Sequence, residues 1–110
     1  MHKISVQEKY YNMLKAGTKT IELRLFDDKR KLIKKGDVIE FSSSQDAEDK
    51  FQATVIGLHR AKNFAELCGV VDVKKTGFAT KQELMKVLED FYTLERQNAL
   101  GVVGIEISKR

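Results

Sequence analysis

The amino-acid sequence predicts an α+β fold, a small mixed β-barrel flanked by helices. The expected elements run helix, about three strands, several helices and a closing strand, and this irregular order disfavours a doubly wound parallel sheet. Residues 20–25 alternate strictly between apolar and polar side chains, which is typical of a half-buried strand. The closing strand, residues 102–107, is so apolar that it must pair with an earlier strand, because as a free edge it would invite aggregation.

The composition predicts one domain over residues 1–110, in a cytoplasmic protein without a membrane partner. Hydrophobic residues make up 42% of the chain, too many for a wholly disordered one. No proline and no Gly/Ser-rich linker divides it. The N-terminus lacks the apolar core of a signal peptide, and no apolar run approaches the roughly 18 residues of a membrane helix. The single cysteine, Cys68, excludes an intramolecular disulfide framework and suits a reducing compartment. The oligomeric state stays open.

The first half of the chain is expected to hold one helix and three strands. Ser5 and Glu8 have the spacing of a capping box, which predicts a helix over residues 7–16 that ends at Gly17. In the strand at residues 20–25, two sets of side chains are expected on opposite faces: Ile21, Leu23 and Leu25 on one, and Thr20, Glu22 and Arg24 on the other. A charged turn follows at residues 27–31. Two further strands, 38–41 and 51–58, flank a polar hairpin loop at 42–50.

The second half is expected to be mostly helical until the closing strand. Asn63, Thr80 and Thr93 are candidate N-caps, because their side chains can accept hydrogen bonds from the first free backbone amides. They predict helices over three segments, residues 64–68, 81–91 and 94–99. Gly101 ends the last of these helices. The apolar stripe of the middle helix is expected in the core: Leu84, Val87, Leu88 and Phe91.

The positive charge is concentrated in one fifth of the chain. The whole sequence carries a formal charge of +4. Residues 15–35 hold eight basic and three acidic residues, a net +5, whereas the remainder holds 12 basic and 13 acidic residues, a net −1. Lys and Arg side chains clustered beside a strand can neutralise phosphates and release their counterions. The alternative interpretation is a solvated basic surface, which is what charge runs most often are.

Residues 17–24, Gly-Thr-Lys-Thr-Ile-Glu-Leu-Arg, resemble the G-x-K-T-x-E-x-R signature of ASCH domains. The likeness continues through residues 33–41, with a Gly-Asp turn into a strand, and through the closing segment 101–107. This resemblance implies a PUA-like fold with a cleft beside the barrel, and RNA or a modified nucleotide as the ligand. We expect phosphate contacts from five basic residues, Lys19, Arg24, Lys29, Arg30 and Lys31. Thr20 and Glu22 are expected to read or orient the ligand.

The alternative to a binding module is an enzyme. Some small members of the family are similar in size and deacetylate N4-acetylcytidine, and others are ribonucleases. The resemblance to the amidohydrolases places Lys19 at their catalytic lysine, but Glu22 stands where they have a threonine nucleophile, and their later glutamate falls near Gly77. If the protein is an enzyme, Lys19 and Glu22 are its candidate catalytic residues. We expect Glu22 to pair with Lys19 instead and to keep its amine protonated. A third interpretation is a scaffold for a protein partner.

No cofactor and no metal are expected. The histidines His2 and His59 and the lone Cys68 lack metal-ligand spacing, and the chain has neither a G-x-G-x-x-G nor a Walker A motif. A nucleophilic pair of Cys68 and His59 stays open, although a buried, inert thiol is favoured. Among the phenylalanines, Phe41 and Phe51 are expected in the core. Phe26 is the best candidate to stack on a base.

Overall fold

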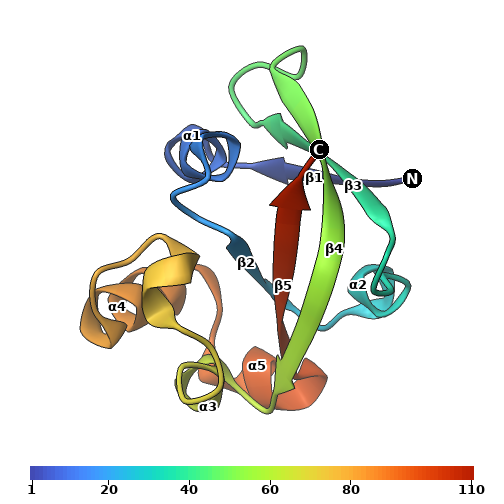
Figure 1. The fold of residues 1–110 in the computed structure, drawn as a ribbon. Coiled ribbons are helices and arrows are strands. Elements are labelled where there is room, and N and C mark those ends of the chain that lie inside the picture. The colour runs from blue at the N-terminus through green and yellow to red at the C-terminus, as the bar shows by residue number, and fades with distance from the viewer.

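All 110 residues are described by the structure, a computed structural model. It contains five strands, five α-helices and one short 3-10 helix (Figure 1). In chain order these are β1 His2–Val6, α1 Glu8–Ala16, β2 Ile21–Leu25, α2 Asp28–Lys31, β3 Val38–Ser43, β4 Lys50–Ala61, α3 Phe64–Leu67, η1 Val73–Thr76, α4 Lys81–Phe91, α5 Leu94–Leu100 and β5 Val102–Lys109. No helix is long and apolar enough to cross a lipid bilayer.

The strands form one mixed sheet in the order β1-β3-β4-β5-β2. The β1–β3 pair is parallel, and the other three neighbouring pairs are antiparallel. The sheet curls into a half-barrel with helices around it, which confirms the predicted α+β class (Figure 1). The closing strand β5 lies between β4 and β2, so its apolar residues are paired on both sides, as expected.

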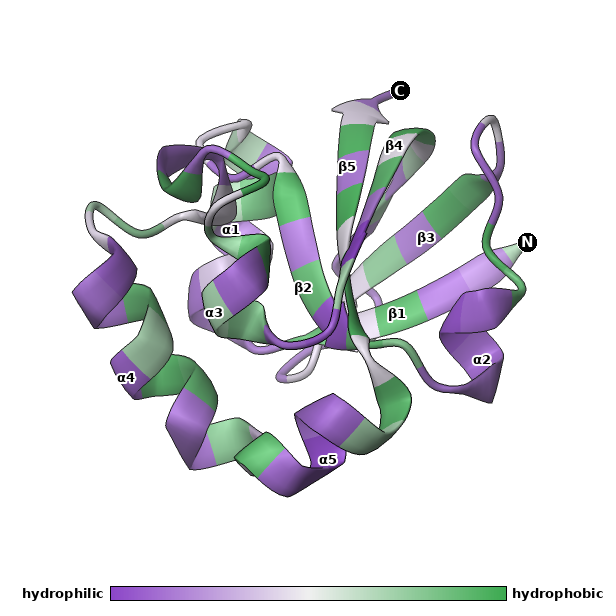
Figure 2. Cartoon of the chain, turned by 90° about the horizontal axis from the view of Figure 1, so that it is seen from below, coloured by the Kyte–Doolittle hydropathy of each residue, from purple (hydrophilic) through white to green (hydrophobic).

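Two apolar clusters hold the sheet and the helices together. One joins α1 to β1, β3, β4 and β5, and contains Phe41 with Phe51 packed against it, as predicted. The other lies between β2 and the helices α3 and α4, where Ile21, Leu23 and Leu25 are all buried. Along β2 hydrophobic and hydrophilic residues alternate (Figure 2). The predicted alternation of residue types along this strand is therefore confirmed. The strand is not half-buried as predicted, because Glu22 is buried as well and Arg24 is partly buried.

The N-terminal segment differs from the prediction. Residues 2–6 form strand β1, and Ser5 lies within it, so the predicted capping box does not form. Helix α1 begins at Glu8, and Gln7 before it makes no side-chain cap. The reason is tertiary: pairing with β3 buries Ile4 and Val6. The helix does end where predicted, at Gly17 in the left-handed conformation with φ of 86°.

Most of the remaining boundaries agree with the sequence. Asn63, Thr80 and Thr93 each accept a hydrogen bond from a backbone amide at the start of a helix, as predicted. The charged turn is instead the short helix α2, which Asp27 caps by accepting from the Arg30 amide. Both strands of the hairpin run beyond their predicted ends, so the loop between them is shorter. Phe91 is 48% exposed and does not belong to the core, contrary to the prediction.

Candidate functional site

A cavity of about 230 Å³ opens where the two edge strands of the sheet, β1 and β2, approach each other. Helices α1 and α4 both lie on the same side of β2 (Figure 1), and both contribute to the walls. Polar groups come from β1 and β2, whereas α1, α4 and the segment before α4 contribute mainly rings and aliphatic side chains. The lining comprises Ser5, Val6, Gln7, Tyr10, Lys19, Glu22, Leu23, Arg24, Ser44, Phe78, Val87, Leu88, Phe91 and Tyr92.

Glu22 lies at the centre of the polar wall, between two cations. Its Oε2 accepts from Nε of Arg24 at 3.0 Å and lies 2.8 Å from Nη2, while its Oε1 lies 3.3 Å from Nζ of Lys19. The residue is only 6% exposed. Burial alone would raise the pKa of Glu22, but the charges of Lys19 and Arg24 outweigh it and hold this pKa below its ordinary value. Glu22 is therefore a carboxylate inside the cavity.

Lys19 is held in place by backbone oxygens. Its Nζ donates to the carbonyl of Ile21 at 2.8 Å and to that of Thr76 at 2.9 Å, with the Glu22 carboxylate nearby. Burial lowers the pKa of Lys19, and the carboxylate of Glu22 acts in the opposite direction. Three surrounding oxygens match the three N–H donors of an ammonium, whereas a neutral amine would point its lone pair at one of them. The arrangement therefore favours protonated Lys19.

Arg24 is the charged residue of the cavity with unused donors. Besides its bonds to Glu22, Nη2 donates to the carbonyl of Ser5 on β1 at 3.0 Å. Its other terminal nitrogen, Nη1, has no partner within the protein. Only one side-chain nitrogen or oxygen in the protein is buried without a hydrogen-bond partner, and that atom is Nε of Arg30. Nη1 of Arg24, which also has no partner, is therefore not buried. Nη1 therefore contacts solvent and can donate to a ligand.

The structure brings together three of the predicted site residues and separates the others. Lys19, Glu22 and Arg24 line the cavity. Thr20 does not line it, because it lies just before β2, where its backbone bonds to Lys75 and Ile107. The three basic residues of α2 also lie outside the lining: Lys29, Arg30 and Lys31.

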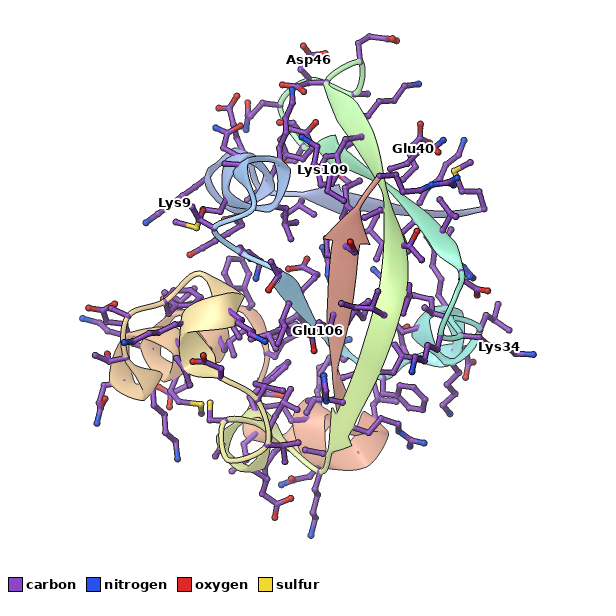
Figure 3. The ribbon with its side chains drawn as sticks, viewed as in Figure 1. Lys9, Lys34, Glu40, Asp46, Glu106 and Lys109 are labelled. Atoms are coloured by element: carbon purple, nitrogen blue, oxygen red, sulfur yellow. The ribbon has the colours of Figure 1, made fainter.

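Helix α2 stands on the other side of the sheet from α4. Lys34, which follows α2, lies at the opposite side of the molecule from α4 (Figure 3). All four residues of α2 are hydrophilic (Figure 2), and none is buried. The basic stretch of the sequence is thus divided between Lys19 and Arg24, which line the cavity, and the cations of α2, which do not.

The aromatic walls are the part of the site that sequence reasoning missed. Phe91 ends α4, Tyr92 follows it, and both line the cavity together with Tyr10 and Phe78. The signal available in the sequence was the pair of adjacent aromatic residues at a predicted helix end. Phe26, the predicted stacking residue, lies elsewhere.

One face of the Phe26 ring is already occupied. The guanidinium carbon of Arg60 on β4 lies 3.8 Å from the ring centroid. Phe26 does not line the cavity. The aromatic ring with the greatest exposure at the cavity is instead Phe91.

The position of Gly77 relative to Lys19 can be compared with the enzyme alternative. A Cβ atom at Gly77 would lie 3.4 Å from Cδ of Lys19. The position that the amidohydrolase resemblance assigns to a catalytic acid is therefore beside Lys19, and it carries no side chain. Glu22, paired with two cations, occupies the nucleophile position of that resemblance.

The remaining candidates from the sequence lie outside the cavity. His59 contacts Glu106 at 2.8 Å, and Cys68 is partly buried at the end of α3, where burial raises its thiol pKa. No hydrogen bond joins His59 to Cys68. No group of three or more His, Cys, Asp and Glu side chains gathers anywhere in the molecule in a way that could hold a metal ion.

Comparison with known proteins identifies a family model and several solved structures that are similar to this chain. The family model described as "ASCH domain" matches residues 4–110. A search of curated proteins finds no match. Among solved structures, a hypothetical protein named PH0355 is 35% identical, with a TM-score of 0.85 over 98% of this chain and 97% of that one. Protein PF0455 from Pyrococcus furiosus is 28% identical, with a TM-score of 0.73 over 98% and 96% of the two chains.

A more distant structure shares the fold alone. The ASCH protein of Zymomonas mobilis is 12% identical, with a TM-score of 0.68 over 96% of this chain and 65% of that one. The fold class is thus the PUA-like one that the sequence motif implied. Because the family model covers almost the whole chain, the protein described by this sequence belongs to the ASCH domain family.

Proposed function

We propose that the protein binds RNA or a free nucleotide by taking one base into the cavity between β1, β2 and α4. The observation that carries the proposal is a carboxylate and a guanidinium held inside an aromatic-walled cavity. Convergent polar groups in a mainly apolar hollow are the usual form of a small-ligand site. Membership of the ASCH family, which is generally associated with RNA binding, supports the same conclusion.

The size of the cavity suits one ring system. Its volume of about 230 Å³ is below the roughly 300–1,000 Å³ of drug-sized sites. A base fits such a hollow, while the sugar and phosphates stay at the opening. Phe91 and Tyr92 offer the rings on which a base can stack, an interaction worth about 1–3 kcal/mol per base in single-strand binders.

We assign the phosphate contacts to residues outside the cavity. Lys29 and Lys31 of α2 are exposed, and Arg30 is partly buried, with its Nε inaccessible. All three lie a few residues beyond the end of β2. A longer strand with one base in the cavity would have to pass the end of β2 before its more distant phosphates reach this group. Inside the cavity a phosphate is disfavoured, because the Glu22 carboxylate would repel it. Thr20, which lies outside the lining, is left without a ligand contact in this proposal.

The division between cavity and α2 can be tested with two ligands. We expect Arg24→Ala to weaken binding of both a nucleoside monophosphate and a single-stranded oligonucleotide, measured by calorimetry and fluorescence anisotropy. The double variant Lys29→Ala/Lys31→Ala should weaken only the oligonucleotide and lower the logarithmic salt slope of its binding by about 1.4, because each phosphate contact of a single strand contributes about 0.7. Equal binding of both ligands by parent and Arg24→Ala, with the variant folded, would contradict the proposal.

The enzyme alternative makes a different prediction. The Lys19 ammonium donates to two backbone carbonyls, so it is a poor base, and no hydroxyl nucleophile stands at position 22. We therefore expect neither acetate release from N4-acetylcytidine nor cleavage of RNA during long incubation with excess protein. Turnover that disappears in Lys19→Ala and in Glu22→Gln would establish an enzyme and displace the binding proposal.

A further inference from the structure

We infer that the cavity reads the base-pairing edge of an unpaired base through an N–H group that donates to Glu22, while Arg24 donates to a separate acceptor of the nucleotide. This inference rests on the proposed function and goes beyond it, since it names the part of the base that enters. It excludes double-stranded nucleic acid as the ligand, because pairing already uses that edge.

The acceptor on the protein side is Glu22. Its Oε2 takes both contacts from Arg24, whereas Oε1 faces only Lys19 Nζ, at 3.3 Å. Each carboxylate oxygen has two lone-pair sites, so Oε1 keeps capacity for another donor. A buried carboxylate is a strong acceptor, and a lone pair placed against it is repelled. A ligand atom next to Glu22 must therefore carry a hydrogen.

The donor on the protein side is Nη1 of Arg24. Its guanidinium is fixed by Glu22 and by the Ser5 carbonyl, so Nη1 is held in place without being used by the protein. A planar guanidinium held at two points is pre-organised, and a ligand acceptor loses little entropy of the side chain on binding. Glu22 and Arg24 lie two positions apart on β2 and both line the cavity. Because Oε2 of Glu22 contacts Nε and Nη2, Nη1 lies on the side of the guanidinium turned away from Glu22, so it serves a ligand acceptor separate from the donor.

The free acceptor of Glu22 matches the pairing edge of a base. Uracil and guanine present a ring N–H on this edge, and adenine and cytosine present an amino group there. Each base therefore offers an N–H donor to the carboxylate through its pairing edge. A sugar hydroxyl could also donate, but it would not fill an aromatic-walled cavity. A phosphate offers only acceptor oxygens, so the Glu22 carboxylate would repel it.

Methylated nucleotides test the inference on the unmodified protein. The four 5′-monophosphates are compared by calorimetry with analogues whose edge donor is blocked: 3-methyluridine, N6,N6-dimethyladenosine, N4,N4-dimethylcytidine, and guanosine methylated once at N1 and twice at N2. For every parent that binds, we expect blocking to weaken binding at least about tenfold, because a hydrogen bond to a charged group is lost. The 5-methyluridine monophosphate carries its methyl group away from this edge and should bind like uridine monophosphate.

The possible results separate the two proposals. Equal binding of parent and edge-blocked nucleotides would overturn the inference and leave the proposed function standing. An equal loss with 5-methyluridine and 3-methyluridine would also overturn it, because the cavity would then reject bulk and not read an edge. Failure of every mononucleotide and of a single-stranded oligonucleotide to bind would overturn the proposed function itself. With Glu22→Gln, shown to be folded by its melting temperature, the discrimination against blocked edges should shrink at least about threefold.

Discussion

Arg24 on β2 donates from Nη2 to the backbone carbonyl of Ser5 on β1, at 3.0 Å. These strands are the two edges of the sheet, which are not paired with each other. A side chain therefore bridges the opening that the backbone ladder leaves. The same guanidinium holds Glu22, so one residue links the closure of the half-barrel to the polar wall of the cavity.

Loss of this bridge is expected to cost stability. Arg24→Ala removes the donor to Ser5 and one of the two cations beside Glu22, and we expect a decrease in the free energy of unfolding of about 1–3 kcal/mol. Urea unfolding monitored by circular dichroism measures it. The matched control is Arg96→Ala on α5, an exposed arginine without an ion pair, which should change stability little. Equal effects of the two substitutions would show that the bridge is not stabilising.

The pair of Lys19 and Glu22 is expected to be strongly coupled. Lys19→Met leaves the Ile21 and Thr76 carbonyls without their donor and removes a cation beside Glu22, so we expect a loss of about 3–5 kcal/mol. Glu22→Gln leaves the buried Lys19 and the partly buried Arg24 without their anion. The double variant should lose less than the sum of the single ones, by roughly 0.5–3 kcal/mol, because no charge is then stranded between the two positions. A strictly additive double-mutant cycle would contradict the coupling.

Stability is expected to fall in acid partly through Glu22. Its pKa in the folded protein lies below the ordinary value of 4.5, so between these two values the unfolded chain binds more protons than the folded one. The contribution of Glu22 is therefore complete above its ordinary pKa and is lost as the pH falls through the lowered folded value. Unfolding free energies measured between pH 7 and pH 3 should decrease less steeply for Glu22→Gln than for the parent.

An exposed glutamate provides the control for this pH dependence. Glu89 lies on α4 and is exposed. Glu89→Gln should retain the acid sensitivity of the parent. The assignment to Glu22 is wrong if the two glutamine variants give the same profile. Some acid sensitivity should survive in Glu22→Gln, because the pKa of Glu106 is also lowered, mainly by its hydrogen bond with His59.

Phe91 and Phe26 are expected to differ in their effect on nucleotide binding. Phe91 is exposed at the cavity, so Phe91→Ala should weaken binding of a mononucleotide by about 1–3 kcal/mol. Phe26 lies outside the cavity with Arg60 over one face, so Phe26→Ala should leave this affinity unchanged. Calorimetric titration of both variants makes the comparison. A larger loss for Phe26→Ala would return the stacking role to the residue that the sequence favoured.

Features that depend on near neighbours in the chain could be predicted from the order of residues. The cap at Thr80 and the apolar spacing after it predicted α4 with its observed bounds, because a cap and a helical stripe involve residues only three or four positions apart. Strict alternation predicted β2 in the same way. The signature in residues 17–24 also pointed to the ASCH family, and with it to the fold and to the importance of Lys19, Glu22 and Arg24.

Which residues form the cavity together depends on contacts between segments that are far apart in the chain. Strand β1 forms because it pairs with β3, more than thirty positions away, and this pairing buries Ile4 and Val6. No pattern within residues 2–6 predicts such a distant partner. The cavity depends on β1 and β2 approaching as opposite edges of a curled sheet, with the end of α4 beside them. This long-range arrangement leaves Phe91 exposed at the cavity. It also separates the cations of α2 from Arg24, although all of them lie in the basic stretch of residues 15–35.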